Sequence, residues 1–308
     1  MSKKNIDLAK KLLRRGELVI FPTETVYGLG GDATNDKAIK LIYKVKKRPK
    51  NNPLICHFSN LKEIEKYFYL SDIEKIIAKK FWPGPLTLIL KKRENNKLSK
   101  YLSHNSNYVG CRIPKNKIAR KLITINNNPI AAPSANLSQR TSITNIKDID
   151  PVLSKKVFIL KSTQSSYGLE STVIKINKRD NIEILRFGSI SVEELNKISI
   201  ITKVKVIKRS SLSPGNMSKH YSTKKPIRMN VKKVFDNEGL LNFGNIKLKS
   251  KIINLNLSKK GNLNEAAVNF YHYLHKLDKS KCKRIAVVNI PNDGLGKTIN
   301  DRLKRAIK

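Results

Sequence analysis

Apolar residues recur at helical spacing in some segments of the chain and form short uninterrupted runs in others. Near the N-terminus, the apolar residues 6, 9, 12 and 13 share one face of a helix that ends at Gly16. The same spacing predicts further helices over 36–46, 61–67, 73–81, 187–197, 263–277 and 298–307. Short β-rich runs predict strands within 17–23, 53–58, 87–91, 108–114, 129–136, 156–160, 171–176, 183–188 and 284–291. This alternation of short helices and short strands predicts an α/β or α+β fold.

One stretch interrupts the alternation. Residues 209–226, which include the sequence SPGNMSKHYS, are rich in Ser, Pro and Gly and follow neither a helical nor a strand period. A chain of 308 residues has room for one large domain or two ordinary ones. We therefore place a domain boundary in this stretch. The helix that precedes it is expected to begin with a capping box formed by Ser191 and Glu194.

The formal net charge of +40 is high enough to suggest a nucleic acid or another anionic partner. However, only 14 of the 63 basic residues are Arg, and the lysines are spread along the whole chain among many Asn and Ile residues. Nucleic-acid sites tend to cluster their charge and to favour Arg. We therefore interpret the charge mainly as a compositional bias, which is still compatible with an anionic substrate.

The cysteines and the N-terminus indicate a reduced, cytoplasmic setting. The three cysteines, Cys56, Cys111 and Cys282, are scattered and form no CxxC pair, so neither a zinc ribbon nor a disulfide framework is indicated. No apolar run approaches the roughly 20 residues that cross a bilayer. The first residues lack the apolar stretch of a signal peptide. We expect no membrane association.

Three familiar motifs fail on inspection. Gly-Lys-Thr at 296–298 resembles the end of a phosphate-binding P-loop, but the first glycine of that loop would fall on Pro291. Gly28-x-Gly30-x-x-Ala33 loosely fits a dinucleotide fingerprint, yet the region where its acidic residue belongs is basic, at 46–48. No GxSxG elbow occurs. Without a partner pattern, surface or helix-face positions are expected for His104, His272 and His275.

Four other segments carry candidate chemistry. FPTETVYGLGGD (21–32) is predicted to turn after a strand and to bring backbone N–H groups and hydroxyls to a ligand. KVKKRPKNNPL (44–54) ends a helix in basic residues, which either bind an anion or complement the helix dipole. APSANLS (132–138) places a serine before an expected helix, either at an anion site or as an ordinary N-cap. GLESTVIKI (168–176), with the ILRFG that follows, adds hydroxyls and an arginine.

These segments form a consistent set. They supply small hydroxyls and glycines together with the cations Lys46, Arg48, Arg112 and Arg186, but neither a metal cluster nor a nucleophile with its base. A site of this kind binds a polyanion and orients reactants, as activation of a substrate by ATP requires.

In this order, PTETVYGLG, KxKxR followed by PxxNPL, APSAN, GLESTV and ILRFG resemble the L-threonylcarbamoyl-AMP synthases, the YrdC-like family, over residues 5–200. The remainder resembles the long form of that family, with a linker of the SPG…HY type and the run GLGKTINDRLKRA (294–306). The chain departs from the family at Phe187, where a proline is usual, and at Tyr108, where a small hydroxyl residue is common.

The resemblance implies an α/β fold in which a twisted, mixed sheet has an open concave face and a smaller Rossmann-like domain follows. It divides the chain into a catalytic domain (1–206), a linker that also acts as a lid (207–225) and a C-terminal α/β domain (226–308). The lid is expected because a reactive anhydride needs protection from water. A plain flexible tether is the alternative for the same residues.

The implied reaction joins L-threonine, bicarbonate (or CO2) and ATP into threonylcarbamoyl-AMP and releases pyrophosphate. The product would then pass to transferase partners that modify adenosine 37 of tRNAs reading ANN codons. Mg²⁺ is expected to arrive with the nucleotide, with no metal site in the protein. Two alternatives stay open: a non-catalytic RNA-binding module, with weak RNA binding on its basic face, and a carbamoyl transferase with another acceptor.

The resemblance also assigns residues to substrates. Lys46 and Arg48 are the expected catalytic residues. The threonine pocket is expected to contain Thr25, His57, Arg112, Ala132, Ser171 and Thr172, with Arg112 pairing with the threonine carboxylate. ATP is expected to contact Lys46, Arg48, Asn52, Tyr108, Ser134, Asn136, Ser142, Arg186, His220 and Tyr221. Lys219 is expected to join His220 at the phosphates.

Overall fold

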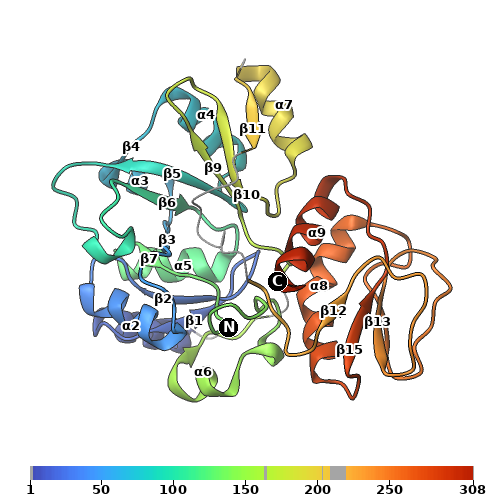
Figure 1. Cartoon of the computed structure of the whole chain (residues 1–308). Coiled ribbons are helices and arrows are strands. Elements are labelled where there is room, and N and C mark those ends of the chain that lie inside the picture. Colours follow the sequence, from blue (N-terminus) through green and yellow to red (C-terminus); the bar gives the residue numbers. More distant parts are fainter. Residues whose placement is uncertain (1–2, 163–164, 203, 209–219, 308) are drawn as a thin grey trace.

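A computed structural model describes residues 3–162, 165–202, 204–208 and 220–307 (Figure 1). Its helices are α1 (Lys3–Arg14), α2 (Asp36–Lys46), α3 (Leu61–Tyr67), α4 (Asp72–Phe81), α5 (Lys117–Asn126), α6 (Pro151–Lys156), α7 (Val192–Thr202), α8 (Leu263–Lys279) and α9 (Gly294–Ile307). Single 3₁₀ turns occur at η1 (Lys100–Leu102) and η2 (Ile146–Asp148). Most of these elements begin and end close to the predicted positions, whereas α5 and α6 were not predicted.

A large mixed sheet forms the first part of the molecule. Its strands are β1 (Val19–Phe21), β2 (Gly28–Asp32), β3 (Ile55–His57), β4 (Phe68–Tyr69), β5 (Leu86–Lys92), β6 (Tyr108–Arg112), β7 (Ile130–Ala131), β8 (Phe158–Ile159), β9 (Thr172–Ile176), β10 (Ile182–Arg186) and β11 (Val206–Lys208). The order is β11-β10-β9-β5-β6-β3-β7-β2-β1-β8, with β4 beside β5. Parallel and antiparallel neighbours are mixed, which confirms the predicted class.

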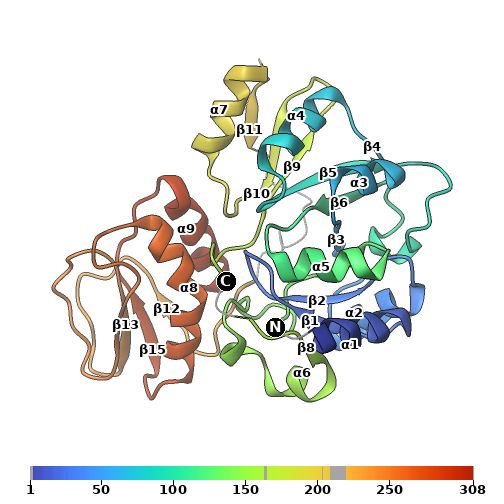
Figure 2. The same ribbon diagram turned by 180° about the vertical axis from the view of Figure 1, so that it is seen from behind.

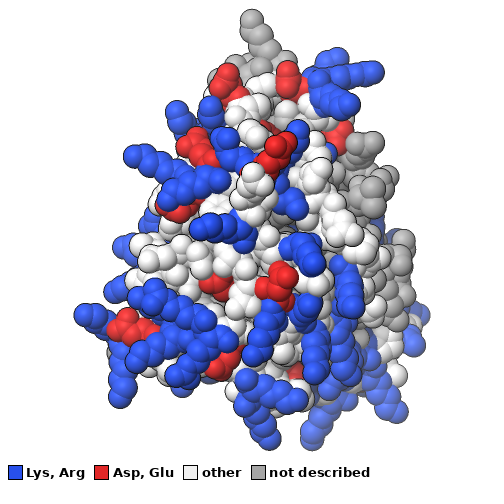
Figure 3. All heavy atoms as spheres, turned by 90° about the vertical axis from the view of Figure 1, so that its left-hand side faces the viewer, with Lys and Arg blue, Asp and Glu red and all other residues white. Residues whose placement is uncertain are grey.

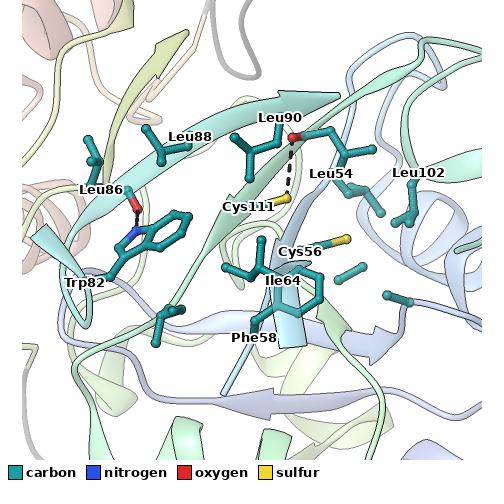
Figure 4. Close-up of a cluster of buried hydrophobic side chains, with 14 of the residues drawn as sticks. Leu54, Cys56, Phe58, Ile64, Trp82, Leu86, Leu88, Leu90, Leu102 and Cys111 are labelled. Carbon is teal, nitrogen blue, oxygen red and sulfur yellow. Dashed lines mark hydrogen bonds between the residues drawn. The ribbon is translucent and has the colours of Figure 1, made fainter. Parts of the chain in front are cut away.

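The sheet and helices α3 and α4 enclose a hydrophobic core, which Figure 4 shows in close-up. Aliphatic side chains of β5 meet Phe58, Ile64 and the two buried cysteines there. The Trp82 indole is also buried, and its Nε1–H donates to the Leu86 carbonyl at 2.7 Å. Burying this much apolar surface stabilises the frame from which the polar side chains of the strand ends project.

Two motif interpretations were wrong at the level of secondary structure. GLGG is not part of a turn, because Gly28–Asp32 is strand β2, paired antiparallel with β1. Its glycine is needed for packing, since a Cβ on Gly30 would lie 2.6 Å from the Phe21 ring. APSAN is followed by a loop and not by a helix, and residues 132–145, all of them described, contain none. The anion site at a helix N-terminus expected there is therefore absent.

The second part is a smaller α/β unit. Its strands β12 (Ile227–Arg228), β13 (Glu238–Asn242), β14 (Asn254–Asn256) and β15 (Arg284–Val287) form a parallel sheet in the order β12-β15-β13-β14. Figures 1 and 2 show α8 and α9 on the same face of this sheet, the face toward the first part. A doubly wound Rossmann sheet carries helices on both faces, whereas the described part of this unit shows them on one, so the Rossmann-like character of the unit stays a prediction.

The two parts are packed together through α8 and α9. Val26 and Leu169 of the first part belong to the hydrophobic cluster of the second. Gly168 lies so close to α8 that a Cβ on it would sit 2.1 Å from the Ala267 carbonyl oxygen. His272 Nδ1 lies 2.6 Å from Asp148 Oδ2, so His272 is an interface residue on a helix face. His275 lies on the same interface, with its Nε2 3.0 Å from the Ser142 carbonyl oxygen and 3.2 Å from Thr141 Oγ1.

Only the two ends of the predicted linker (207–225) lie in the described part of the chain: residues 207–208, which belong to β11, and residues 220–225. Residues 209–219, with Lys219 among them, lie outside it, so the proposed lid and the exact domain limits stay predictions. The following segment touches both parts: His220 N–H donates to the Arg305 carbonyl at 3.3 Å, and Ser222 N–H donates to the Gln139 carbonyl at 2.8 Å. None of the described helices has the length and apolar character that a membrane span requires.

Candidate active site

A polar cavity lies where the strand ends of the large sheet meet the segment 220–221. It encloses about 610 Å³ of empty space, part of it continuous with solvent. The residues that line it are Thr23, Thr25, Val26, Gly28, Arg48, Pro53, Ile55, His57, Arg112, Ala132, Pro133, Ser134, Glu170, Ser171, Arg186, His220 and Tyr221. Several elements distant in sequence therefore converge here, as in an active site built on a rigid sheet.

The segment between β1 and β2 is held in a tight turn by its own side chains. Thr23 Oγ1 donates to the Val26 carbonyl at 2.6 Å and accepts from the N–H groups of Thr25 and Val26. Thr23 Oγ1 also lies 2.9 Å from Thr25 Oγ1. Threonine hydroxyls favour such local turns. The turn fixes two hydroxyls in the cavity wall.

Arg112, at the end of β6, is anchored by this turn. Its Nη2 donates to Glu24 Oε1 at 2.5 Å and its Nη1 donates to Thr25 Oγ1 at 2.9 Å. Burial alone would raise the pKa of Glu24, but the Arg112 charge and hydrogen bonds outweigh it and the pKa is lowered. Arg112 Nε has no hydrogen-bond partner among the described residues. A buried guanidinium with an unused N–H is suited to an incoming carboxylate.

His57 is buried beside this arginine. Burial, followed by the Arg112 charge, lowers the pKa of His57 to about 3. Its Nδ1 lies 3.3 Å from the Ile130 carbonyl oxygen. The ring is therefore neutral at physiological pH and contributes a polar wall without a charge.

The basic residues of the KVKKR segment have different roles. The ammonium of Lys46 is buried and donates to the carbonyls of Ser134 and Asn136. Burial, with the charge of Arg48 adding to it, holds its pKa well below the usual range. Lys46 thus supports the APSAN loop from behind and does not line the cavity. Lys47 is exposed, at the left-handed C-cap of α2.

Arg48 reaches the cavity and is held by the turn that follows it. Its Nε donates to the Asn52 carbonyl at 2.9 Å, and its Nη2 donates to Asn52 Oδ1 at 2.5 Å and to the Pro53 carbonyl at 2.9 Å. Burial lowers the pKa of Arg48 to about 10, so the group remains a cation. Asn52 therefore orients Arg48 from outside the cavity lining.

A third cation comes from the end of β10. Arg186 Nη2 donates to the Ser171 carbonyl at 2.8 Å and to Ser171 Oγ at 3.0 Å. Ser171 Oγ lies 2.8 Å from Thr87 Oγ1. Burial lowers the pKa of Arg186. Arg186 and Ser171 thus form one preorganised unit in the wall.

The acidic neighbour of this unit is Glu170. Its Oε1 accepts from Ser142 Oγ at 2.5 Å and from Tyr271 Oη at 2.8 Å, while Oε2 accepts from Arg302 Nε at 3.0 Å. Burial would raise the pKa of Glu170, but the Arg302 and Arg186 charges and the hydroxyl donors lower it to about 2. Tyr271 and Arg302 belong to α8 and α9, so the second part of the molecule takes part in the cavity wall.

His220 and Tyr221 line one side of the cavity. Their ring centroids are 4.0 Å apart in an edge-on arrangement. Tyr221 is buried, with a φ of 64° that L-residues rarely adopt. Burial lowers the pKa of His220 to about 3, and its Nδ1 has no hydrogen-bond partner within the described chain. His220 is therefore a neutral group at physiological pH.

The structure brings most of the predicted site residues together. Those that line the cavity are Thr25, Arg48, His57, Arg112, Ala132, Ser134, Ser171, Arg186, His220 and Tyr221. Those that support it from behind are Lys46, Asn52, Asn136 and Ser142. Asn136 donates to the Leu137 and Arg140 carbonyls and so holds its loop.

Two expected ligand contacts have no support in the geometry. Tyr108 is 39% exposed at the start of β6, where Lys175 lies 3.8 Å from its ring centroid, in a separate surface groove. The hydroxyl of Thr172 donates to the Ile190 carbonyl and accepts from the Ile190 N–H. Both of its hydrogen-bonding functions are used in the fold, and Thr172 is not part of the cavity lining.

The sequence interpretation missed four polar residues: Thr23, Glu24, Glu170 and Arg302. The first three lie inside quoted motifs, and an acidic residue between two threonines or before Ser-Thr was a signal that could have been used. Arg302 lies in the run INDRLKRA, but no local pattern shows that it pairs with Glu170.

The arrangement favours binding of an anion with several negative charges. The guanidiniums of Arg48, Arg112 and Arg186 line the cavity. The nearby carboxylates are both paired, Glu24 with Arg112 and Glu170 with Arg302. In a partly buried site such charges act strongly because water screens them poorly. The described residues contain no group of three or more His, Cys, Asp or Glu side chains that could hold a metal ion.

Comparison with known proteins agrees with this geometry. A family model described as "Telomere recombination" (Sua5_yciO_yrdC) matches residues 11–188, and one described as "Threonylcarbamoyl-AMP synthase, C-terminal domain" (Sua5_C) matches residues 190–307. The threonylcarbamoyl-AMP synthase of Pyrococcus abyssi is 32% identical over 321 residues, covering 98% of this chain and 93% of that protein. That of Bacillus subtilis is 32% identical over 329 residues, covering 97% and 91%.

The fold agrees as well. The crystal structure of P. abyssi Sua5 complexed with L-threonine matches with a TM-score of 0.88 at 29% identity, covering 100% of this chain and 95% of that one. The resemblance inferred from the motifs is thus confirmed over nearly the full length of both chains. The chain belongs to the threonylcarbamoyl-AMP synthase family, in the form with two matched domains.

Proposed function

We propose that this chain synthesises L-threonylcarbamoyl-AMP from L-threonine, bicarbonate (or CO2) and ATP, with release of pyrophosphate. The threonine amine captures the one-carbon unit as a carbamate, and a carbamate oxygen then attacks the α-phosphorus of ATP. Two anions must approach each other in this step, so fixed positive charge and exclusion of water are what the protein has to supply. The observation that carries the proposal is the cavity lined by three guanidiniums, of which that of Arg112 is buried and those of Arg48 and Arg186 are partly buried.

The wall around Arg112 is suited to threonine. A substrate carboxylate would find the unused Nε–H of Arg112, next to the Thr25 hydroxyl. The neutral His57 ring and Ala132 line the same cavity, where an uncharged wall leaves room for the substrate methyl group. This assignment keeps Arg112 as the carboxylate-binding residue, but through one free N–H rather than through a free bidentate fork.

Other residues of the lining are suited to a nucleotide. Arg48, Arg186, Ser134 and Ser171 present cations and hydroxyls from the first part of the molecule. Tyr221 adds an aromatic surface and His220 an unpaired ring nitrogen. We infer that Lys46 contributes indirectly, by fixing the carbonyls of the loop that carries Ser134. Mg²⁺ would neutralise phosphate charge and enter as the ATP complex.

The finer biological role follows from the product. We infer that threonylcarbamoyl-AMP is handed to transferase partners that modify adenosine 37 of tRNAs reading ANN codons. Figure 3 shows Lys and Arg side chains over much of the face that carries α2, α3 and β4, with acidic side chains scattered among them. Such a surface would attract RNA weakly and without base readout.

Pyrophosphate release tests the proposal. We expect release from ATP only when L-threonine and bicarbonate are both present. L-serine should be slower by about 10- to 100-fold, because a methyl group in a fitted pocket is worth about 1–3 kcal/mol. Equal release with and without threonine would rule out the assignment, whereas release with another amine acceptor would favour the carbamoyl-transfer alternative.

A further inference from the structure

Arg302 connects the second part of the molecule to the cavity without lining it. It lies on α9, is 1% exposed, and donates from Nε to Glu170 Oε2 at 3.0 Å. Its Nη2 donates to the Phe187 carbonyl at 2.5 Å, next to Arg186. Its Cζ lies 4.6 Å from the ring centroid of Tyr221. One side chain of α9 therefore contacts both the acidic residue and the aromatic residue of the cavity wall.

Glu170 is an unusual group to find in a cavity built for an anion. An uncompensated carboxylate in a poorly hydrated wall would repel the phosphates of ATP by several kcal/mol at contact distances. Its hydroxyl partners, Ser142 and Tyr271, orient the carboxylate but carry no positive charge. Its ion pair is with Arg302. The net charge that a nucleotide meets at this wall thus depends on a residue of the second part.

Tyr221 depends on the same residue. Its backbone has a positive φ of 64°, which costs about 1 kcal/mol or more in an L-residue. The ring contacts the Arg302 guanidinium and lies near Tyr271, whose ring centroid is 6.0 Å away. A cation–π contact in a buried site is worth about 2 kcal/mol. Arg302 therefore helps to keep Tyr221 in the wall of the cavity.

We propose that Arg302 is a positioning residue for nucleotide binding: it neutralises Glu170 and holds Tyr221. The second part of the molecule thereby sets the charge and shape of a site whose lining residues belong to the first part and to the segment 220–221. The proposal rests on the proposed function only in taking ATP as the anion. It assigns to α9 a role beyond attachment of one part to the other.

The same helix offers a matched control. Lys297 of α9 also pairs across the interface, with Glu193 at 2.7 Å, but its side chain is 35% exposed and that of Glu193 is 49% exposed. A pair on the surface contributes little to stability and does not touch the cavity. Each variant thus removes one interface cation from the same helix. Lys297→Gln removes a cation at the surface, and Arg302→Gln removes one that lies directly behind the cavity wall.

The test measures ATP affinity of the full-length chain by isothermal titration calorimetry, together with KM and kcat. Arg302→Gln should weaken ATP binding and raise the KM for ATP by at least about tenfold, the effect of one opposed charge in a poorly screened site. Lys297→Gln should stay within about twofold of the wild type. Equal effects of the two substitutions would overturn the proposal.

The double variant Glu170→Gln/Arg302→Gln separates charge from architecture. Removing both members of a buried ion pair is often tolerated where removing one is not. We therefore expect it to recover most of the ATP affinity lost in Arg302→Gln, even if the single variant folds poorly. A double variant that binds ATP as weakly as the single one, or does not fold, would show a purely structural role and overturn the proposal.

These experiments distinguish failure of the proposed role of Arg302 from failure of the proposed reaction. A wild-type chain that binds ATP but makes no threonylcarbamoyl-AMP would refute the reaction, and the affinities of the three variants would still decide the role of Arg302. A wild-type chain that does not bind ATP would refute both.

Discussion

At the scale of single residues, burial decides what each basic side chain does. Lys46 and Arg48 are two positions apart, yet the first is turned into the protein to hold two carbonyls and the second lines the cavity. Lys47 between them is exposed. The sequence alone could not separate these roles, because all three are basic residues at the end of one helix.

Lys46→Ala should therefore be damaging for a structural reason. Each buried carbonyl that loses its donor costs about 1–3 kcal/mol, and the loop that carries Ser134 would shift. We expect a clearly lower melting temperature and at least about a 100-fold loss of turnover, the scale for losing a charge-stabilising or site-forming group. Lys47→Ala is the control and should change neither. If Lys47→Ala were the more damaging, the assignment of this motif would be wrong.

Arg48→Ala should separate function from stability. Arg48 lines the cavity, and its partners Asn52 and Pro53 belong to the adjoining turn. We expect at least about a 100-fold loss of turnover, because a cation next to the reacting phosphates is removed. Compared with Lys46→Ala, the change in melting temperature should be small. A variant with normal turnover would exclude Arg48 from the chemistry.

His220 predicts a pH dependence of stability. Its pKa in the folded chain is about 3, against 6.5 for the ordinary residue, so between these values the unfolded chain binds more protons. Stability conferred by the neutral ring is thus lost as pH falls through this window. His220→Gln should reduce the stability lost between pH 7.5 and 4.5 by about 2–3 kcal/mol in urea unfolding. The exposed His104, changed to Gln, serves as control. An unchanged pH dependence in His220→Gln would contradict the buried neutral ring.

At the scale of elements, the local signals of the sequence were reliable where the structure is local. Helix α2 begins and ends as predicted because Asn35 caps it and its apolar period is regular. Ser191 and Glu194 form the predicted capping box. In contrast, GLGG was mistaken for a turn, since the reason for its glycine is the Phe21 ring on the neighbouring strand.

In the candidate site, too, the sequence predicted local features but not the arrangement that depends on neighbouring strands. Ser171 and Thr172 are adjacent, but they precede and begin β9, where successive side chains point to opposite faces, so only Ser171 reaches the cavity. Tyr108 and Arg112 lie at opposite ends of β6, about 13 Å apart at the rise of a strand, so they cannot serve the same ligand end. The Arg302–Glu170 pair spans 132 residues and has no signal in the sequence.

Gly168 provides a test of how α8 is docked. Its φ is +71°, and a Cβ there would meet the Ala267 carbonyl oxygen at 2.1 Å. Gly244 has a similar φ of +67°, with nothing within 4 Å of a Cβ. Gly244→Ala should therefore cost about 1 kcal/mol of stability from backbone strain alone. Gly168→Ala should cost a further 1–3 kcal/mol or so, from steric clash at the interface.

Thermal unfolding would measure the stability of the Gly168→Ala and Gly244→Ala variants, and titration with ATP would measure their affinity for the nucleotide. Gly168→Ala should also lose ATP affinity, since the adjoining Glu170–Arg302 pair would be strained. Matching behaviour of the two glycine variants in both measurements would contradict the close packing of α8 on this loop.

At the scale of the whole molecule, the two parts share one site. The large sheet supplies the strand ends and cations of the cavity, and α8 and α9 supply partners of Glu170 and Tyr221 (Figures 1 and 2). The segment at 220–222 hydrogen-bonds to both parts. The overall charge of +40 is a separate property, since Lys and Arg side chains are spread widely over the face that Figure 3 shows.

Because the surface charge is separate from the cavity, we expect RNA binding to be non-specific. Binding of tRNA should weaken steeply with salt and should not distinguish tRNA from an unrelated RNA of equal length. Filter binding or fluorescence anisotropy from about 50 to 200 mM salt would measure it. Strong discrimination at the higher salt concentration would show that the basic face is a specific RNA site.

The most direct test of the proposed reaction follows the carbon atom of bicarbonate into the product. Full-length protein would be incubated with ATP, L-threonine and ¹³C-labelled bicarbonate, and the nucleotide products identified by mass spectrometry. The proposed reaction predicts an adenylate that carries one labelled carbon and one threonine, formed together with pyrophosphate. Formation of AMP or ADP without any labelled adenylate, under conditions in which the protein binds ATP, would contradict it.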